Sequence, residues 1–279
     1  MSETNGNSKS KLHGIWALTN RELKKWYKAP VIFILSIIQP IIWMGLLGKA
    51  MNIGALIPNV PGIDPGTILQ KTLGTSDYFS FMSVGMIAFT ALFTTMFSGM
   101  SVVWDRRLGF LNKVLSTPVS RAVIIFSKVL SATLRSMFQA GVIILVAVVL
   151  GLRFGASFTP LNLLGVFAIM FLVCVGLSSL FIAITIRSTR IETPMAVVNL
   201  INLPLMFASN AFFPTQFMPN WLQTIAKFNP LTYTTDAVRQ LLIFNTDYTQ
   251  LALDFTYVGI FAVITAAIGI ILSWRFLSK

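Results

Sequence analysis

Six apolar stretches separated by polar segments dominate the pattern of this chain. Each has roughly the 20 mostly apolar residues that a helix needs to cross a hydrocarbon core about 30 Å thick. The stretches cover residues 31–50, 81–103, 124–150, 161–186, 194–213 and 255–275. This pattern predicts an all-α membrane protein in which residues 30–279 form six transmembrane helices.

The segment before the first stretch is amphipathic. A helix over residues 12–29 would have one apolar side and one basic side, at about 100° per residue. The apolar side holds Leu12, Ile15, Trp16, Leu23, Trp26 and Tyr27, and the basic side holds Arg21, Lys24, Lys25 and Lys28. We expect this helix to lie in the membrane interface, either as a simple anchor or as a sliding helix coupled to events below the membrane. Residues 1–11 form a polar tail without the apolar core of a cleaved signal peptide.

Composition and charge support this topology. The chain has 279 residues, of which 55% are hydrophobic and 11% charged, and its mean hydropathy is +0.78. A net charge of +12 would suggest nucleic acid in a soluble protein. Here most Lys and Arg residues fall on one side of the predicted topology, and such residues are biased to the cytoplasmic side. We therefore expect a multi-pass plasma-membrane protein with both termini in the cytoplasm and no nucleic-acid partner.

The sequence lacks the motifs and residue types that several kinds of chemistry require. The chain has no G-x-x-x-x-G-K-[ST] phosphate loop and no G-x-G-x-x-G motif, so we expect no ATPase site and no enzymatic activity in this chain. Cys174 and His13 are the only residues of their types, which makes a metal site improbable. The nine acidic residues fall outside the six predicted spans, which disfavours an ion-coupled carrier.

The segment between the second and third stretches, residues 105–121, is too charged to lie in lipid. Leu108, Leu111 and Leu115 have i, i+3, i+7 spacing, which predicts a short amphipathic helix that ends before Pro118. Its polar face would present Arg106, Arg107 and Lys113. One interpretation of that face is a solvated surface that binds lipid phosphates.

A second interpretation comes from a resemblance. The pattern D-R-x-x-G-F-L-x-x-x-L-x-x-P-V-S-R, from Asp105 to Arg121, is similar to the cytoplasmic signature of type-2 ABC transporter permeases, particularly drug-resistance exporters of the daunorubicin kind. In that family this loop is the coupling helix that rests on a separate ATPase subunit. The resemblance assigns the coupling role to Asp105, Arg106, Arg107, Leu108, Gly109, Leu111, Lys113, Pro118 and Arg121.

A second block in the last third resembles the same family. It contains Ser209-Asn210-Ala211-Phe212-Phe213-Pro214, Pro219-Asn220-Trp221-Leu222 and Phe228-Asn229-Pro230-Leu231-Thr232-Tyr233. In the family this segment forms short re-entrant helices that cap the exit of the pathway between spans five and six. The prolines agree with this, because they break the backbone into pieces too short to span. The residues expected in this outer cap are Phe213, Pro214, Pro219, Trp221, Asn229, Pro230 and Tyr233; the alternative is an ordinary outer loop with aromatic anchors.

A polar or aromatic path through the spans has several candidate residues. Arg135 lies inside the third stretch, where a charge is costly. It either lines a path, paired with Gln139 or an anionic substrate, or makes a structural hydrogen bond to a neighbouring helix. The candidates for substrate contact are Arg135, Gln139, Phe89, Phe93, Phe97, Asn199, Asn202 and Phe207. The phenylalanines suit a lipophilic cargo but would equally suit contact with lipid.

The resemblance implies the permease subunit of an ATP-driven exporter. Such a subunit would move a lipophilic or amphipathic substrate, such as a drug, lipid or glycan-like molecule, by alternating access. The expected partners are a second copy of the chain, two ATPase subunits that bind ATP and Mg²⁺, and membrane lipids. The alternatives are a membrane scaffold or assembly protein, and a channel or carrier that works without ATP.

Overall fold

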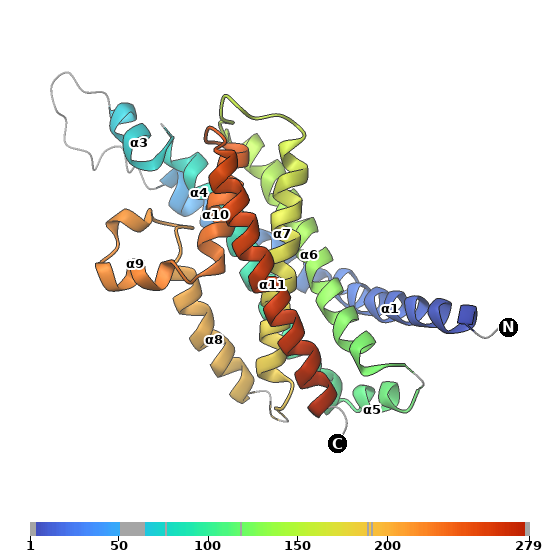
Figure 1. Cartoon of the computed structure of the whole chain (residues 1–279). Coiled ribbons are helices and arrows are strands. Elements are labelled where there is room, and N and C mark those ends of the chain that lie inside the picture. Colours follow the sequence, from blue (N-terminus) through green and yellow to red (C-terminus); the bar gives the residue numbers. More distant parts are fainter. Residues whose placement is uncertain are drawn as a thin grey trace.

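The computed structural model describes residues 4–50, 65–75, 77–117, 119–188, 190 and 192–276, and every regular element in them is helical (Figure 1). Among these residues, four helices are long and apolar enough to cross a membrane. They are α4 (Tyr78–Arg107), α6 (Arg121–Val149), α7 (Asn162–Thr185) and α11 (Tyr248–Phe276). They coincide with the apolar stretches over 81–103, 124–150, 161–186 and 255–275, and the largest difference is the earlier start of α11.

The first and fifth predicted spans correspond to shorter helices. Residues 31–50 become α2 (Pro30–Trp43), which continues as a π-helix, η1 (Met44–Ala50). Residues 194–213 become α8 (Glu192–Phe207). Each contains an internal proline, Pro40 or Pro204, which removes a backbone hydrogen bond and disturbs the helix. That these two segments also span the membrane stays a prediction.

Helix α4 lies at the centre of the bundle. It packs against α6, α7, α8, η1 and α10 (Pro230–Leu242), and most of its side chains are buried. Fully buried residues such as Met82, Met86 and Leu92 form the core around it. Helix α11, in contrast, packs mainly on α7 and leaves much of its surface open. Any movement of α4 therefore involves most of the bundle.

Two carboxylates lie inside the long helices, although both lie outside the apolar stretches that predict the spans. Asp105 lies in α4 and Asp254 in α11, and both are buried. The helices extend beyond the apolar stretches, and this brings the flanking acids into them. Asp254 accepts hydrogen bonds from Nε2 of Gln240, at 3.1 Å, and from Nε2 of Gln250, at 3.0 Å, which compensates for its burial.

The N-terminal helix α1 (Thr4–Tyr27) lies across the bundle rather than along it (Figure 1). It begins within the predicted tail 1–11 and packs against α6. Trp16 and Tyr27 are exposed, as an interfacial helix requires, but Trp26 instead packs on Phe33 and Phe138, with ring centroids 4.8 and 5.7 Å away. The C-terminal end of α11 and the short helix α5 (Phe110–Leu115) lie at the same end of the bundle, hereafter the α5 end (Figure 1).

Candidate functional site

A sharp turn separates α4 from α5. Gly109 has φ 71°, a left-handed conformation that glycine adopts without strain. No atom lies within 4 Å of the position that a Cβ at Gly109 would occupy. The backbone conformation, rather than crowding, therefore favours glycine here.

Helix α5 packs through Leu111 and Leu115 of the predicted face, but Leu108 departs from it. Leu111 and Val114 are buried against Ile124 and Ile125 of α6. Leu108, expected on the same face as Leu111 and Leu115, is 80% exposed. The reason is that Leu108 terminates α4 and the turn at Gly109 separates it from α5. Leu108 therefore projects from the α5 end, beside exposed Arg107 and Lys113.

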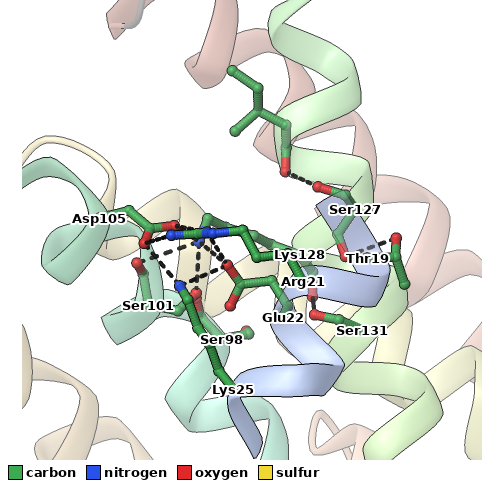
Figure 2. Close-up of polar contacts among 11 residues, drawn as sticks. Thr19, Arg21, Glu22, Lys25, Ser98, Ser101, Asp105, Ser127, Lys128 and Ser131 are labelled. Atoms are coloured by element: carbon green, nitrogen blue, oxygen red, sulfur yellow. Dashed lines mark hydrogen bonds and ion pairs between the residues drawn. The ribbon is translucent and has the colours of Figure 1, made fainter. Parts of the chain in front are cut away.

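Behind this turn lies a network of charges, of which Glu22, Asp105 and Lys128 are buried, and it joins α1, α4 and α6 (Figure 2). Asp105 is only 2% exposed. Its Oδ2 accepts a hydrogen bond from Lys128 Nζ at 2.6 Å. Its Oδ1 accepts from Arg21 Nη2 at 3.2 Å and from Lys25 Nζ at 3.0 Å. The carboxylate thus faces the interior of the protein.

Glu22 completes the network from α1. Its Oε1 accepts from Arg21 at 2.9 Å and from Lys25 at 3.0 Å, and Lys128 Nζ lies 3.5 Å away. Lys128 also donates to Ser101 Oγ of α4 at 3.1 Å. The network, defined here as Arg21, Glu22, Lys25, Asp105 and Lys128, contains three cations and two carboxylates and so carries a net positive charge.

An aromatic contact connects this network with α5. The Arg21 guanidinium lies over the Phe110 ring, 3.2 Å from its centroid, in cation–π geometry. Phe110 is the first residue of α5. The position of α5 therefore depends on Arg21 of α1 as well as on the turn at Gly109.

The remaining predicted coupling residues have separate environments. Arg106 Nη1 donates to the backbone oxygen of Ser188, at 3.1 Å, which connects the end of α4 to the segment after α7. Arg121 begins α6 and is half-buried, whereas Arg107 and Lys113 are exposed. Pro118 lies outside the described residues. The predicted coupling residues thus form two groups, one that faces the interior of the protein and one that is exposed.

The predicted outer cap lies between α8 and α11. Its part before α10, residues 208–229 and hereafter the cap segment, includes η3 (Thr215–Phe217) and α9 (Asn220–Ala226). Asn229 is buried and caps α10, because its Oδ1 accepts from Leu231 N at 3.0 Å. Its Nδ2 donates to the backbone oxygens of Leu205 and Ala208, both at 2.7 Å. Asn229 therefore joins the start of α10 to the end of α8.

The other cap residues separate into exposed and packed positions. Pro230 is buried, and Tyr233 stacks on Tyr257 with ring centroids 4.0 Å apart. Exposed or half-buried positions are occupied by Phe213, Pro214, Pro219 and Trp221. Helix α10 packs against α4, α7 and α11, so its backbone lies on protein as a re-entrant segment requires.

Arg239 of α10 connects this helix with the cap segment and with α4. It is 2% exposed, and its Nη2 donates to the backbone oxygen of Ala211 at 3.1 Å. Its guanidinium lies 3.5 Å from the ring centroid of Phe81 on α4. A Cβ at Gly85 of α4 would lie 1.9 Å from the oxygen of Ala211. The cap segment and α4 are in backbone contact here.

The eight candidate path residues do not share one environment. Arg135 does not pair with Gln139: its Nε donates to Ser131 O, one turn earlier in α6, at 3.2 Å. Instead, Gln139 Oε1 accepts a hydrogen bond from Thr94 Oγ1, and Gln139 Nε2 donates to Ser36 O at 3.5 Å. The buried or partly buried members are Arg135, Gln139, Phe89, Phe93 and Asn202, and the exposed ones are Phe97, Asn199 and Phe207. Phe89 packs on Phe93 and on Phe212 of the cap segment.

Comparison with known proteins identifies the family. The family model described as ABC-2 type transporter matches residues 13–243, which include the charge network, α5 and the cap segment. This chain belongs to the ABC-2 type transporter family.

Of three relatives from different organisms, two are named as permeases and one as a nodulation protein. The putative transport permease ycf38 of Porphyra purpurea is 35% identical over 236 residues, which are 84% of this chain and 75% of that protein. The daunorubicin resistance ABC transporter permease protein DrrB1 of Streptomyces coeruleorubidus is 23% identical over 168 residues, 60% of this chain and 59% of that protein. Nodulation protein J of Rhizobium leguminosarum bv. trifolii is 24% identical over 231 residues, 81% and 80% of the two chains.

Sequence reasoning did not find most of the network of this ABC-2 permease. It identified Asp105 but assigned no specific role to Arg21, Glu22, Lys25, Lys128 or Phe110. One signal was present: Lys128 follows Arg121 by two turns and lies within an apolar stretch, where a charge requires a partner. The identity of that partner depends on how α1 crosses α6, which a linear pattern does not specify.

Proposed function

We propose that this chain is the transmembrane subunit of an ABC exporter. It would move a lipophilic or amphipathic substrate, such as a drug, lipid or glycan-like molecule, out of the cytoplasm. A separate ATPase subunit, which binds ATP and Mg²⁺, would drive alternating access. Membership of the ABC-2 family and the drug-resistance permeases among the relatives support this proposal.

The arrangement around α5 is the observation that carries the proposal. Arg107, Leu108 and Lys113 project at the end of the bundle, where a partner has access to them. Directly behind them, the network fastens α1, α4 and α6 together. A force on α5 would therefore reach three helices at once, including the central α4, instead of bending a free loop.

The proposed orientation places the α5 end and both termini in the cytoplasm of a plasma-membrane protein. Two copies of the chain and two ATPase subunits would form the complex. Arg107 and Lys113 suit acidic groups on the ATPase. Asp105 would act indirectly, by holding the end of α4 in the network. The cap segment, at the other side of the membrane, would close the exit.

The pathway is proposed to lie between the two copies. Phe97 of α4 and Phe207 of α8 are exposed on the single chain and would face the pathway in the dimer. Their aromatic surfaces suit an apolar cargo. Arg135 and Gln139, inside the chain, would shape the helices around the pathway more than they would contact the cargo.

The test uses the tagged chain together with the ATPase that co-purifies with it, reconstituted in liposomes. The chain alone should hydrolyse no ATP, and the complex should. Gly109→Val should lower hydrolysis by roughly fivefold to thirtyfold, because a β-branched residue in the left-handed region costs about 1–2 kcal/mol. Gly109→Asn is the matched control, since asparagine adopts this conformation more readily and should retain most of the activity.

Two results would contradict the proposal. One is purification of the intact chain without any nucleotide-binding protein. The other is a Gly109→Val complex that hydrolyses ATP and transports as the unmodified complex does.

A further inference from the structure

One face of α1 forms a shallow cationic groove. It is lined by Ala17, Asn20, Arg21, Lys24, Lys25 and Lys28. Their spacing places them on one side of the helix, and the small Ala17 and Asn20 leave space between long basic side chains. This groove is open, and it shares Arg21 and Lys25 with the charge network.

The groove has more positive charge than the protein neutralises. Lys24 and Lys28 are exposed, and the described residues contain no carboxylate paired with either of them. Arg21 and Lys25 share Glu22 and Asp105 with Lys128, so those two carboxylates already serve three cations. An anion in the groove would therefore meet uncompensated charge.

An apolar edge borders the groove on the same helix. Trp16 is 58% exposed and Tyr27 49% exposed. At about 100° per residue both lie next to Asn20 and Lys24 around the helix and away from Glu22, which faces α6. Helix α1 lies across the bundle (Figure 1), so the groove and this edge would both follow the plane of a membrane that the bundle crosses. An amphipathic helix placed in this way has its aromatic residues at the headgroup boundary.

We propose that the cationic groove binds the phosphate of an anionic phospholipid, whose acyl chains lie along Trp16 and Tyr27. A zwitterionic lipid would also bring a positive group close to these cations, so its electrostatic attraction to the groove would be weaker. An acidic protein segment would satisfy the lysines but would leave the neighbouring apolar edge unused. The assignment of this lipid to the cytoplasmic leaflet rests on the proposed function, whereas the binding itself does not.

The test measures lipid binding to the permease alone in lipid nanodiscs. Trp16 is made the only tryptophan by replacing Trp26, Trp43, Trp104, Trp221 and Trp274 with phenylalanine. Its fluorescence is then quenched by brominated phosphatidylglycerol or brominated phosphatidylcholine. The anionic lipid should reach half-maximal quenching at a lower mole fraction. Each lysine near an anionic surface contributes roughly a fivefold preference, so Lys24→Gln/Lys28→Gln should reduce the preference by about 25-fold.

Lys227→Gln is the matched control, because Lys227 is exposed and lies in the cap segment, far along the chain from α1. It should leave the preference unchanged. Equal quenching by the two lipids, or a preference that survives Lys24→Gln/Lys28→Gln, would overturn the proposal. A groove that serves only an acidic protein partner would also give equal quenching. No ATPase is present, so the failure of the exporter proposal would not affect this result.

Discussion

At the scale of single residues, the charge network places ionised side chains in the interior. The side chains of Asp105 and Lys128 are almost completely buried, and burial of an ion is costly unless it is paired and hydrogen-bonded. Lys128 meets this condition through Asp105, Glu22 and Ser101. Replacing all the charges of such a network by well-packed apolar residues often changes the stability little. Removing one partner, in contrast, leaves the other charges buried and unpaired, which is destabilising.

Lys128→Met should therefore destabilise the protein by about 3–5 kcal/mol, the cost of leaving buried carboxylates without their closest cation. The measurement is the thermal unfolding midpoint of the purified chain in detergent. Lys113→Met is the control, because Lys113 is exposed on α5 and its loss should change stability by less than about 0.5 kcal/mol. Equal midpoints for the two variants would show that the network does not hold the α5 end together.

The sequence indicates buried charged residues only where an isolated charge interrupts an apolar stretch. Arg135 is such a residue, whereas Lys128 lies near the start of its stretch, close to the charged segment 105–121. Asp105 was found through the motif around Gly109. That its carboxylate points inward was not predictable, because its partners Arg21 and Lys25 come from a helix 80 or more residues earlier.

At the scale of elements, close contact between the cap segment and α4 depends on Gly85. A methyl group there would lie 1.9 Å from the backbone oxygen of Ala211, and a backbone atom does not move aside as a flexible side chain does. Ala211 also accepts a hydrogen bond from Arg239 of α10. Three segments thus meet at one backbone group.

Gly85→Ala should lower the stability by at least 1–3 kcal/mol, roughly the cost of overpacking, because α4 and the cap segment must separate. Gly259→Ala in α11 is the matched control: no atom lies within 4 Å of its added methyl group, and alanine favours helix by up to about 1 kcal/mol. Thermal unfolding midpoints of both variants provide the comparison. A Gly85→Ala midpoint at or above that of Gly259→Ala would contradict this account of the contact.

Hydrophobic periodicity predicted the positions of the long helices better than it predicted helix ends and irregular turns within helices. It located α4, α6, α7 and α11, because long apolar helices have a clear signature. It did not predict the π-helix after Pro40, the end of α8 at Phe207 or the early start of α11 that brings Asp254 inside a helix. These boundaries depend on capping and on packing against neighbouring helices. The prolines correctly indicated a broken cap segment, but its attachment through Asn229 required the folded structure.

At the scale of the whole molecule, the apolar surface is distributed unevenly. Leu200, Leu203 and Phe207 of α8 are exposed, as are many residues of α2 and α11. In a membrane these faces contact either lipid or another copy of the chain. The proposed dimer places α8 at the shared interface and leaves α11 in lipid.

A cysteine at Leu203 should therefore form a disulfide between two copies in native membranes. Leu203 is 54% exposed on α8, and Val263, 69% exposed on α11, provides the control position. Both variants carry Cys174→Ala, and oxidative cross-linking is followed as a doubled mass on a denaturing gel. Cross-linking at Val263→Cys without any at Leu203→Cys would place the interface on the opposite face and contradict the proposed pathway.

The sequence separation within the charge network fixes an order of events during synthesis. Glu22 and Lys128 are 106 residues apart, and Arg21 precedes Asp105 by 84 residues. When α1 leaves the ribosome, neither of its later partners has been translated, so its charges stay hydrated at the membrane surface. Docking of α1 must wait until the first turns of α6 have been inserted. The N-terminal helix is thus among the first elements to be made and among the later ones to reach its final place.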